Sequence, residues 1–237
     1  MLYALDRLGF HQRTREVINS FPERMKPDGF FAGPEGEWDS NGQVLWIIYQ
    51  HFKFTQSHTW LHNIFPAVQA GVEWIIKKRH THQKNSPLHK GLLPPSLSAE
   101  HFGTVDQYYW DSFWGLAGIR SAARLAEHLH KTDEAAQWNT EAKKFEADIR
   151  HSLDLVHARL GAPLIPATPT RGFDESAVGF VSGIYPLALS ELYPEAFNVS
   201  LDEFVRRFVT PKGFYHPIIH SGYNAYLTLQ LAHAYLW

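Results

Sequence analysis

The chain has 237 residues, enough for one large domain with a substantial core. Its 22 Lys and Arg nearly balance its 24 Asp and Glu, and the formal charge of -2 gives no electrostatic basis for binding nucleic acid or an anionic membrane. Cys is absent, which excludes disulfides and thiolate metal sites but leaves the compartment open. We find no signal-peptide pattern and no long apolar run, and so expect a soluble protein without a membrane partner, cytoplasmic rather than secreted.

Apolar residues at helical spacing predict helices along almost the whole chain. In chain order these cover residues 2–17, 40–54, 60–78, 111–129, 133–156, 176–192, 201–209 and 221–237. Several of them start at an Asp, Ser or Thr, whose side-chain oxygen can accept a hydrogen bond from a free backbone N–H group. Patterns of period two, which indicate strands, are scarce. The predicted class is therefore all-α.

The connections between these helices alternate in character. The connection at 129–135 is short, whereas those at 21–37 and 84–103 are long and rich in Gly and Pro. Such alternation is typical of stacked helical hairpins with the long loops on one face. No low-complexity linker interrupts the chain, so we predict a single domain over 1–237.

The tripeptide Trp-Asp-Ser occurs twice, at 38–40 and at 110–112, each time after a long loop and at the start of a predicted helix. An Asp in that position is most often a helix cap. Aromatic rings beside it, however, can stack on the apolar faces of sugars while polar groups bind the hydroxyls. Aromatic residues make up 14% of the chain, and its net charge is small. Composition alone favours packing of these rings in the core over sugar binding, and the small net charge predicts an uncharged binding partner.

Two segments resemble a known family. The run YYWDSFWGLAGIRSAARLAEHLHKTDEAAQW at 108–138 resembles the segment of glucoamylase-type glycosidases in which a Trp-carboxylate pair opens a helix. The run DGFFAGPEGEWDSNGQVLWIIYQHFKFT at 28–55 resembles an upstream segment of the same enzymes. The first run is also similar to trehalases, in which the equivalent Trp and Asp hold the sugar. The order and separation of the two runs fit the glucoamylase-like pattern better.

The resemblance implies a six-hairpin α/α toroid and an inverting glycoside hydrolase for neutral α-glucosides or gluco-oligosaccharides, with Asp111 as the general acid. Inversion needs a second carboxylate, about 6.5–9.5 Å away, as the base. Aromatic neighbours would raise the pKa of Asp111, and Asp39 would serve as a subsite or capping residue. No metal or organic cofactor is expected. The predicted substrate-binding residues are Trp38, Asp39, Asn41, Glu100, His101, Tyr109, Trp110, His220, Tyr223 and Asn224.

The chain also departs from the family pattern. A complete toroid has twelve helices, and the sequence predicts about eight. The Arg-Asp pair that grips the sugar and the general base would lie before and after the segments present here. We therefore expect an incomplete toroid of about four hairpins, truncated at both ends, that self-associates as a homo-oligomer because large apolar patches rarely stay exposed.

Two alternatives remain open at this stage. The chain could be a non-catalytic remnant that binds carbohydrate or only associates. It could instead be a polysaccharide lyase or sugar epimerase of the α/α-toroid type, in which His216, His220 and Tyr223 neutralise a uronate and remove its proton. The second alternative lacks a basic stripe that would hold a polyanion.

Overall fold

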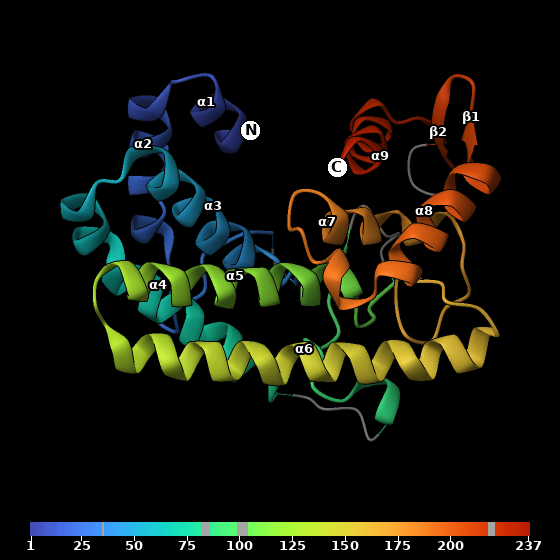
Figure 1. The fold of residues 1–237 in the computed structure, drawn as a ribbon, viewed down its shortest axis with the longest axis horizontal. Helices are drawn as coiled ribbons and strands as arrows, with labels where there is room; N and C mark the ends of the chain where they lie inside the picture. The colour runs from blue at the N-terminus through green and yellow to red at the C-terminus, as the bar shows by residue number, and fades with distance from the viewer. Residues whose placement is uncertain (35, 82–85, 99–103, 218–220) are drawn as a thin grey trace. The chain divides into compact units, whose positions relative to one another are not determined.

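The computed structural model describes residues 1–34, 36–81, 86–98, 104–217 and 221–237 (Figure 1). This part of the chain contains nine α-helices and one small antiparallel sheet of three strands. The helical class predicted from the sequence is therefore confirmed, whereas the sheet was not predicted. None of the helices in these ranges combines the length and apolar character needed to cross a bilayer.

The chain forms two compact units. Unit 1 comprises Met1–Thr81 and Trp114–Phe145, and unit 2 comprises His82–Phe113 and Glu146–Trp237. Two of the three boundaries fall inside helices, α5 (Tyr109–His128) and α6 (Thr132–Leu160), and the third follows Thr81, beyond the end of α4. One domain over 1–237 therefore stays a prediction.

Unit 1 begins with a helix that the sequence predicted as continuous. The structure divides it into α1 and α2, because Gly9 between them adopts a positive φ of 85°, which a helix does not allow. The helices that follow agree closely with the predicted spans. The elements of this part are α1 (Leu2–Arg7), α2 (His11–Asn19), a 3₁₀ turn (Pro22–Arg24), α3 (Ser40–Thr55) and α4 (His58–Arg79).

Helices α3 and α5 cross at glycines. A Cβ atom at Gly42 would lie 2.2 Å from the carbonyl oxygen of Trp114, and one at Gly118 would lie 2.7 Å from the Cα atom of Gly42. Both distances are far shorter than a van der Waals contact, so only glycine permits this approach. The crossing aligns Trp46 of α3 with Trp114 of α5, whose rings meet edge to face at 5.9 Å.

The second half of unit 2 departs most from the sequence prediction. The expected helix at 176–192 is instead a 3₁₀ helix, a single helical turn and a second 3₁₀ turn, interrupted near Pro186, which lacks the N–H group that a helix interior uses. The next helix begins earlier than predicted, at Pro194, a residue suited to a first helical turn. The elements are η2 (Pro87–His89), η3 (Glu175–Phe180), α7 (Val181–Ile184), η4 (Ser190–Leu192) and α8 (Pro194–Phe208).

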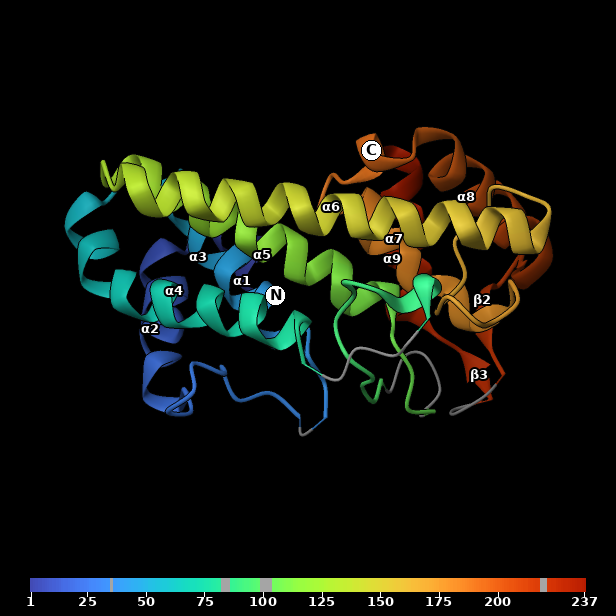
Figure 2. The same ribbon diagram turned by 90° about the horizontal axis from the view of Figure 1, so that it is seen from below.

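The sheet lies between α8 and the last helix. Its strands are β1 (Val209–Thr210), β2 (Gly213–His216) and β3 (Gly222–Tyr223), joined in the order β1-β2-β3 (Figure 2). The predicted final helix at 221–237 therefore starts later, as α9 (Ala225–Leu236). Asn224 caps it, because its side-chain oxygen accepts a hydrogen bond from the Leu227 N–H at 3.0 Å.

A buried polar cluster holds α1 against α3 in unit 1. The Asp6 carboxylate is 1% exposed and accepts a hydrogen bond of 3.0 Å from His51 Nδ1, and His11 Nδ1 lies 2.9 Å from it. On the other side of the buried ring, His51 Nε2 accepts a hydrogen bond of 3.4 Å from Arg15 Nε. A ring that donates through Nδ1 and accepts through Nε2 is neutral. In agreement, burial lowers the pKa of His51, although Asp6 opposes the shift.

We expect stability to fall when the pH is lowered from 7.5 to 5. His51 has a folded-state pKa below its unfolded value of about 6.5, so the unfolded chain binds more protons in this range. The contribution of neutral His51 to the free energy of unfolding is fully present above about pH 6.5. Below that pH the free energy of unfolding falls by no more than about 1.4 kcal/mol per pH unit for one histidine. His157 in unit 2 acts in the same direction, because burial lowers its pKa. Urea unfolding at several pH values measures the effect, and a free energy of unfolding that rises on acidification contradicts it.

Candidate functional site

The candidate catalytic residue, Asp111, lies in the first turn of α5 in unit 2. The helix starts two residues before the predicted position, at Tyr109, so Asp111 is inside the turn and does not precede it. Its side chain is 2% exposed, and its carboxylate accepts a hydrogen bond from the Ser96 hydroxyl. The aromatic residues that flank it in sequence, Tyr108, Tyr109, Trp110 and Phe113, are all buried, and their contact with the Asp111 carboxyl group stays a prediction.

Tyr109, one of these aromatic residues, is buried and has polar partners for its hydroxyl. Its hydroxyl lies 2.7 Å from Ser152 Oγ, and Ser152 Oγ donates in turn to the carbonyl oxygen of Leu88. Burial raises the pKa of Tyr109 far above the ordinary range. These hydrogen bonds anchor α5 to α6 and to the 3₁₀ turn η2, and the contact of Tyr109 with substrate stays a prediction.

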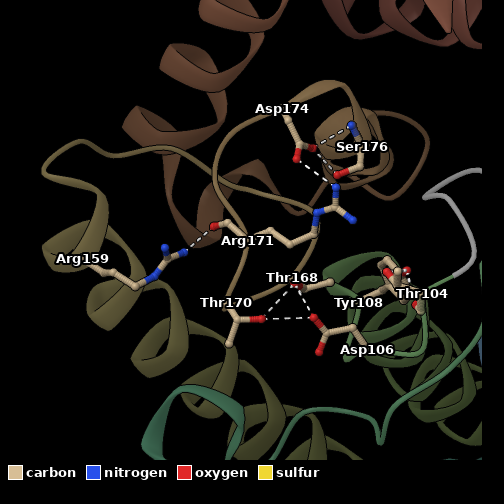
Figure 3. Close-up of polar contacts among 9 residues, drawn as sticks. All are labelled: Thr104, Asp106, Tyr108, Arg159, Thr168, Thr170, Arg171, Asp174 and Ser176. Carbon is tan, nitrogen blue, oxygen red and sulfur yellow. Dashed lines mark hydrogen bonds and ion pairs between the residues drawn. The ribbon is translucent and has the colours of Figure 1, made fainter. Parts of the chain in front are cut away.

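Two loops meet at Asp106, just before α5. The backbone groups of Ser96 and Asp106 form two mutual hydrogen bonds of 2.9 and 3.2 Å, which align the Ser96 hydroxyl with Asp111. The Asp106 carboxylate accepts hydrogen bonds from Thr168 Oγ1 at 2.8 Å and from Thr170 Oγ1 at 3.1 Å (Figure 3). Asp106 therefore fixes both loops to the residues that lead into the Asp111 helix.

Arg171 brings a positive charge to the same region. Its guanidinium donates to Asp174 Oδ2 at 2.9 Å, and Asp174 Oδ1 accepts from the Ser176 N–H at 3.0 Å, which caps η3 (Figure 3). Burial raises the pKa of Tyr108, and its hydrogen bond with Thr104 and the Arg171 charge partly oppose the shift. The region around Asp111 thus combines carboxylates, hydroxyls and one guanidinium within unit 2.

The first Trp-Asp-Ser site lies in unit 1. Asp39 is the residue before α3, and its carboxylate accepts a hydrogen bond of 2.6 Å from Gln43 Nε2, one turn into the helix. Asp39 and Asp111 belong to different units, so their expected arrangement on one rim stays a prediction.

Trp38 takes part in a cation–π cluster. The Lys78 ammonium lies 3.6 Å from the centroid of the Trp38 ring, and the rings of Phe30 and Trp74 each lie 6.0 Å from it. Burial lowers the pKa of Lys78, and the charge of Asp28 opposes the shift. Because the lysine covers one face of Trp38, a sugar that stacks on this ring has only the other face.

Asn41 is fully buried and uses its amide inside the protein. Its Oδ1 atom accepts a hydrogen bond of 2.8 Å from the Phe31 N–H, and its Nδ2 atom donates to the carbonyl oxygens of Gly29 and Gly71 at 2.9 and 3.0 Å. These bonds fix the long loop before α3 against α4. We therefore leave Asn41 out of the proposed site.

Two residues of the lyase alternative, His216 and Tyr223, lie in the described part of the chain. His216 is 1% exposed on β2, whereas Tyr223 is 51% exposed on β3. In the register of these strands Tyr215 pairs with Tyr223, so His216 and Tyr223 point to opposite faces of the sheet. Asn224 serves as the cap of α9. The other predicted site residues, Glu100, His101 and His220, lie outside the described residues.

Sequence reasoning missed the side chains that support Asp111. Ser96, Asp106, Thr168 and Arg171 come from loops as much as 75 residues apart, and no periodic pattern connects them. Among the described His, Asp and Glu side chains, no group of three is arranged to hold a metal ion.

Comparison of the chain with models of known protein families gives no match, and comparison with curated protein sequences gives none either.

Proposed function

We propose that this chain belongs to a glycoside hydrolase that acts on neutral α-glucosides or gluco-oligosaccharides by an inverting mechanism, with Asp111 as the general acid. The observation that carries the proposal is the burial of the Asp111 carboxyl group at the start of α5, where the Ser96 hydroxyl fixes its orientation. Burial favours the protonated form that a general acid needs, whereas the hydrogen bond from Ser96 and the helix start favour the ionised form, so the proposal requires the effect of burial to be the larger one.

The substrate must displace part of the cover over Asp111. The side chain is 2% exposed, and an acid has to come within hydrogen-bond distance of the leaving oxygen. Trp110, which is 7% exposed, precedes Asp111 directly. We propose that a shift of the residues around Trp110 admits the sugar, and that this indole then stacks on it.

The toroid and the oligomer are part of the same proposal. The mostly helical fold agrees with helical hairpins, and α9 exposes apolar side chains at Leu229, Tyr235 and Leu236. An exposed apolar face on a terminal helix is suited to contact with further helices. We propose that the helices that contact this face of α9 belong to a second copy of the chain or to additional hairpins of the ring.

A substrate panel tests the proposed activity. Reducing sugar released from maltose, maltodextrin and trehalose, and ultraviolet absorbance developed from a uronate polymer, are measured with the same preparation. We expect release from maltose and maltodextrin and no absorbance change. Absorbing product from the uronate polymer alone identifies a lyase. Absence of turnover on every substrate contradicts the hydrolase proposal and leaves the non-catalytic role.

A further inference from the structure

Two adjoining pockets form a groove in unit 1. The first has a volume of about 280 Å³ and the second about 270 Å³, and Phe21, Gln43 and Val44 line both. Pockets that bind small molecules have volumes of about 300 Å³ or more. Each pocket is thus slightly small for a complete ligand, and a molecule of disaccharide size needs both.

One end of the groove is aromatic. Tyr3 and Trp46 meet at 5.1 Å with an angle of 64° between their rings, and Trp46 meets Trp114 at 5.9 Å with an angle of 87°. These rings enclose a corner and do not form one flat platform. A corner surrounds a small apolar group from two sides, whereas the face of a sugar ring needs a flat surface. This end therefore suits an aromatic ring or a short alkyl chain.

The other end is polar and has mixed hydrogen-bonding character. Arg24 contributes a donor, Ser40 a hydroxyl and Gln43 an amide. The Gln43 orientation is fixed, because its Nε2 atom donates to the Asp39 carboxylate, which can only accept. The Gln43 carbonyl oxygen is then directed elsewhere and can accept from a ligand. Hydroxyl groups both donate and accept, so a neutral polyol matches this lining better than an anion does.

We propose that this groove binds a neutral glycoside with an apolar aglycone. The aglycone occupies the corner between Tyr3, Trp46 and Trp114, and the sugar hydroxyls pair with Gln43, Ser40 and Arg24. The inference rests on the proposed function in its choice of a glucoside, and it adds a preference for aryl or alkyl glucosides and a site in unit 1.

Calorimetric titration of the full chain with phenyl α-glucoside, methyl α-glucoside and maltose tests the inference. We expect the phenyl glucoside to bind at least about tenfold more tightly than the methyl glucoside. Trp46→Ala should remove that difference. Val44→Phe fills the shared part of the groove and keeps the aromatic corner. It should lower the affinity for all three ligands by about tenfold or more.

Two controls separate this inference from the proposed activity. Tyr226→Ala removes an exposed aromatic ring of unit 2 and should leave all three affinities unchanged. Asp111→Asn should still bind the phenyl glucoside while losing hydrolysis. If the wild-type chain hydrolyses glucosides but binds phenyl and methyl glucosides with equal affinity, the groove inference is overturned and the proposed activity is not. Phenyl-selective binding without hydrolysis overturns the proposed activity alone. Affinities unaffected by both Trp46→Ala and Val44→Phe also overturn the inference.

Discussion

Replacing Asp111 by Asn is expected to lower kcat on maltose by about 10²–10⁴-fold and to change KM little. The Asn side chain has the same shape, and its oxygen can still accept the Ser96 hydrogen bond, so the start of α5 keeps its structure. Only the group that protonates the leaving oxygen is lost. Steady-state kinetics on maltose measures the change, and an unaltered kcat removes Asp111 as the acid.

Two carboxyl replacements serve as matched controls for Asp111→Asn. Asp106→Asn, in the same unit, should lower kcat far less than Asp111→Asn, because its oxygen can still accept from Thr168 and Thr170 although its amide nitrogen cannot accept from the Gln107 N–H. Asp39→Asn should raise KM more than it lowers kcat, because Asp39 is predicted to bind the substrate as a subsite residue and not to protonate it. A loss of kcat that is equally large in all three variants points to general damage and not to an acid.

Replacing Asp6 by Ala is expected to give the largest loss of stability among the polar side chains of unit 1. The fully buried His51 ring then lacks an acceptor for its Nδ1 proton. A buried donor without an acceptor costs about 1–3 kcal/mol. Asp6→Asn retains an oxygen that can accept this bond and should cost less. The free energy of unfolding in urea measures both variants.

A surface ion pair provides the comparison for Asp6. Glu16 pairs with Arg13 across one turn of α2, and both side chains are more than half exposed. Exposed pairs of this kind contribute about 0–1 kcal/mol, so Glu16→Ala should change stability by less than Asp6→Ala. If the two replacements have the same small effect, the Asp6–His51 contact does not hold α1 in place.

The helices with uninterrupted apolar periodicity were predictable from the sequence. The span 40–54 corresponds to α3 (Ser40–Thr55), since the local apolar spacing is uninterrupted there, although the Asp39 side chain makes no capping hydrogen bond and instead accepts from Gln43. The span 176–192 failed, because an apolar pattern alone does not register the interruption at Pro186. The sheet was missed because two of its strands have only two residues each, too few for an alternating pattern.

The residues of the candidate site were predictable only where they are neighbours in sequence, within one short segment. The aromatic residues around Asp111 are its neighbours in sequence, so their burial followed from the motif. Ser96 and Thr168 reach the region through loop contacts that a local pattern does not encode. Lys78 lies 40 residues beyond Trp38 and occupies one face of its ring, which changes the role that the tripeptide suggested.

The most direct test of the proposed mechanism compares two leaving groups in Asp111→Asn. Maltose has a poor leaving group that needs protonation, whereas 2,4-dinitrophenolate leaves without it. If Asp111 is the general acid, the variant should lose about 10²–10⁴-fold in kcat on maltose and much less on 2,4-dinitrophenyl α-glucoside. Equal losses on the two substrates would contradict the assignment of Asp111 as the acid.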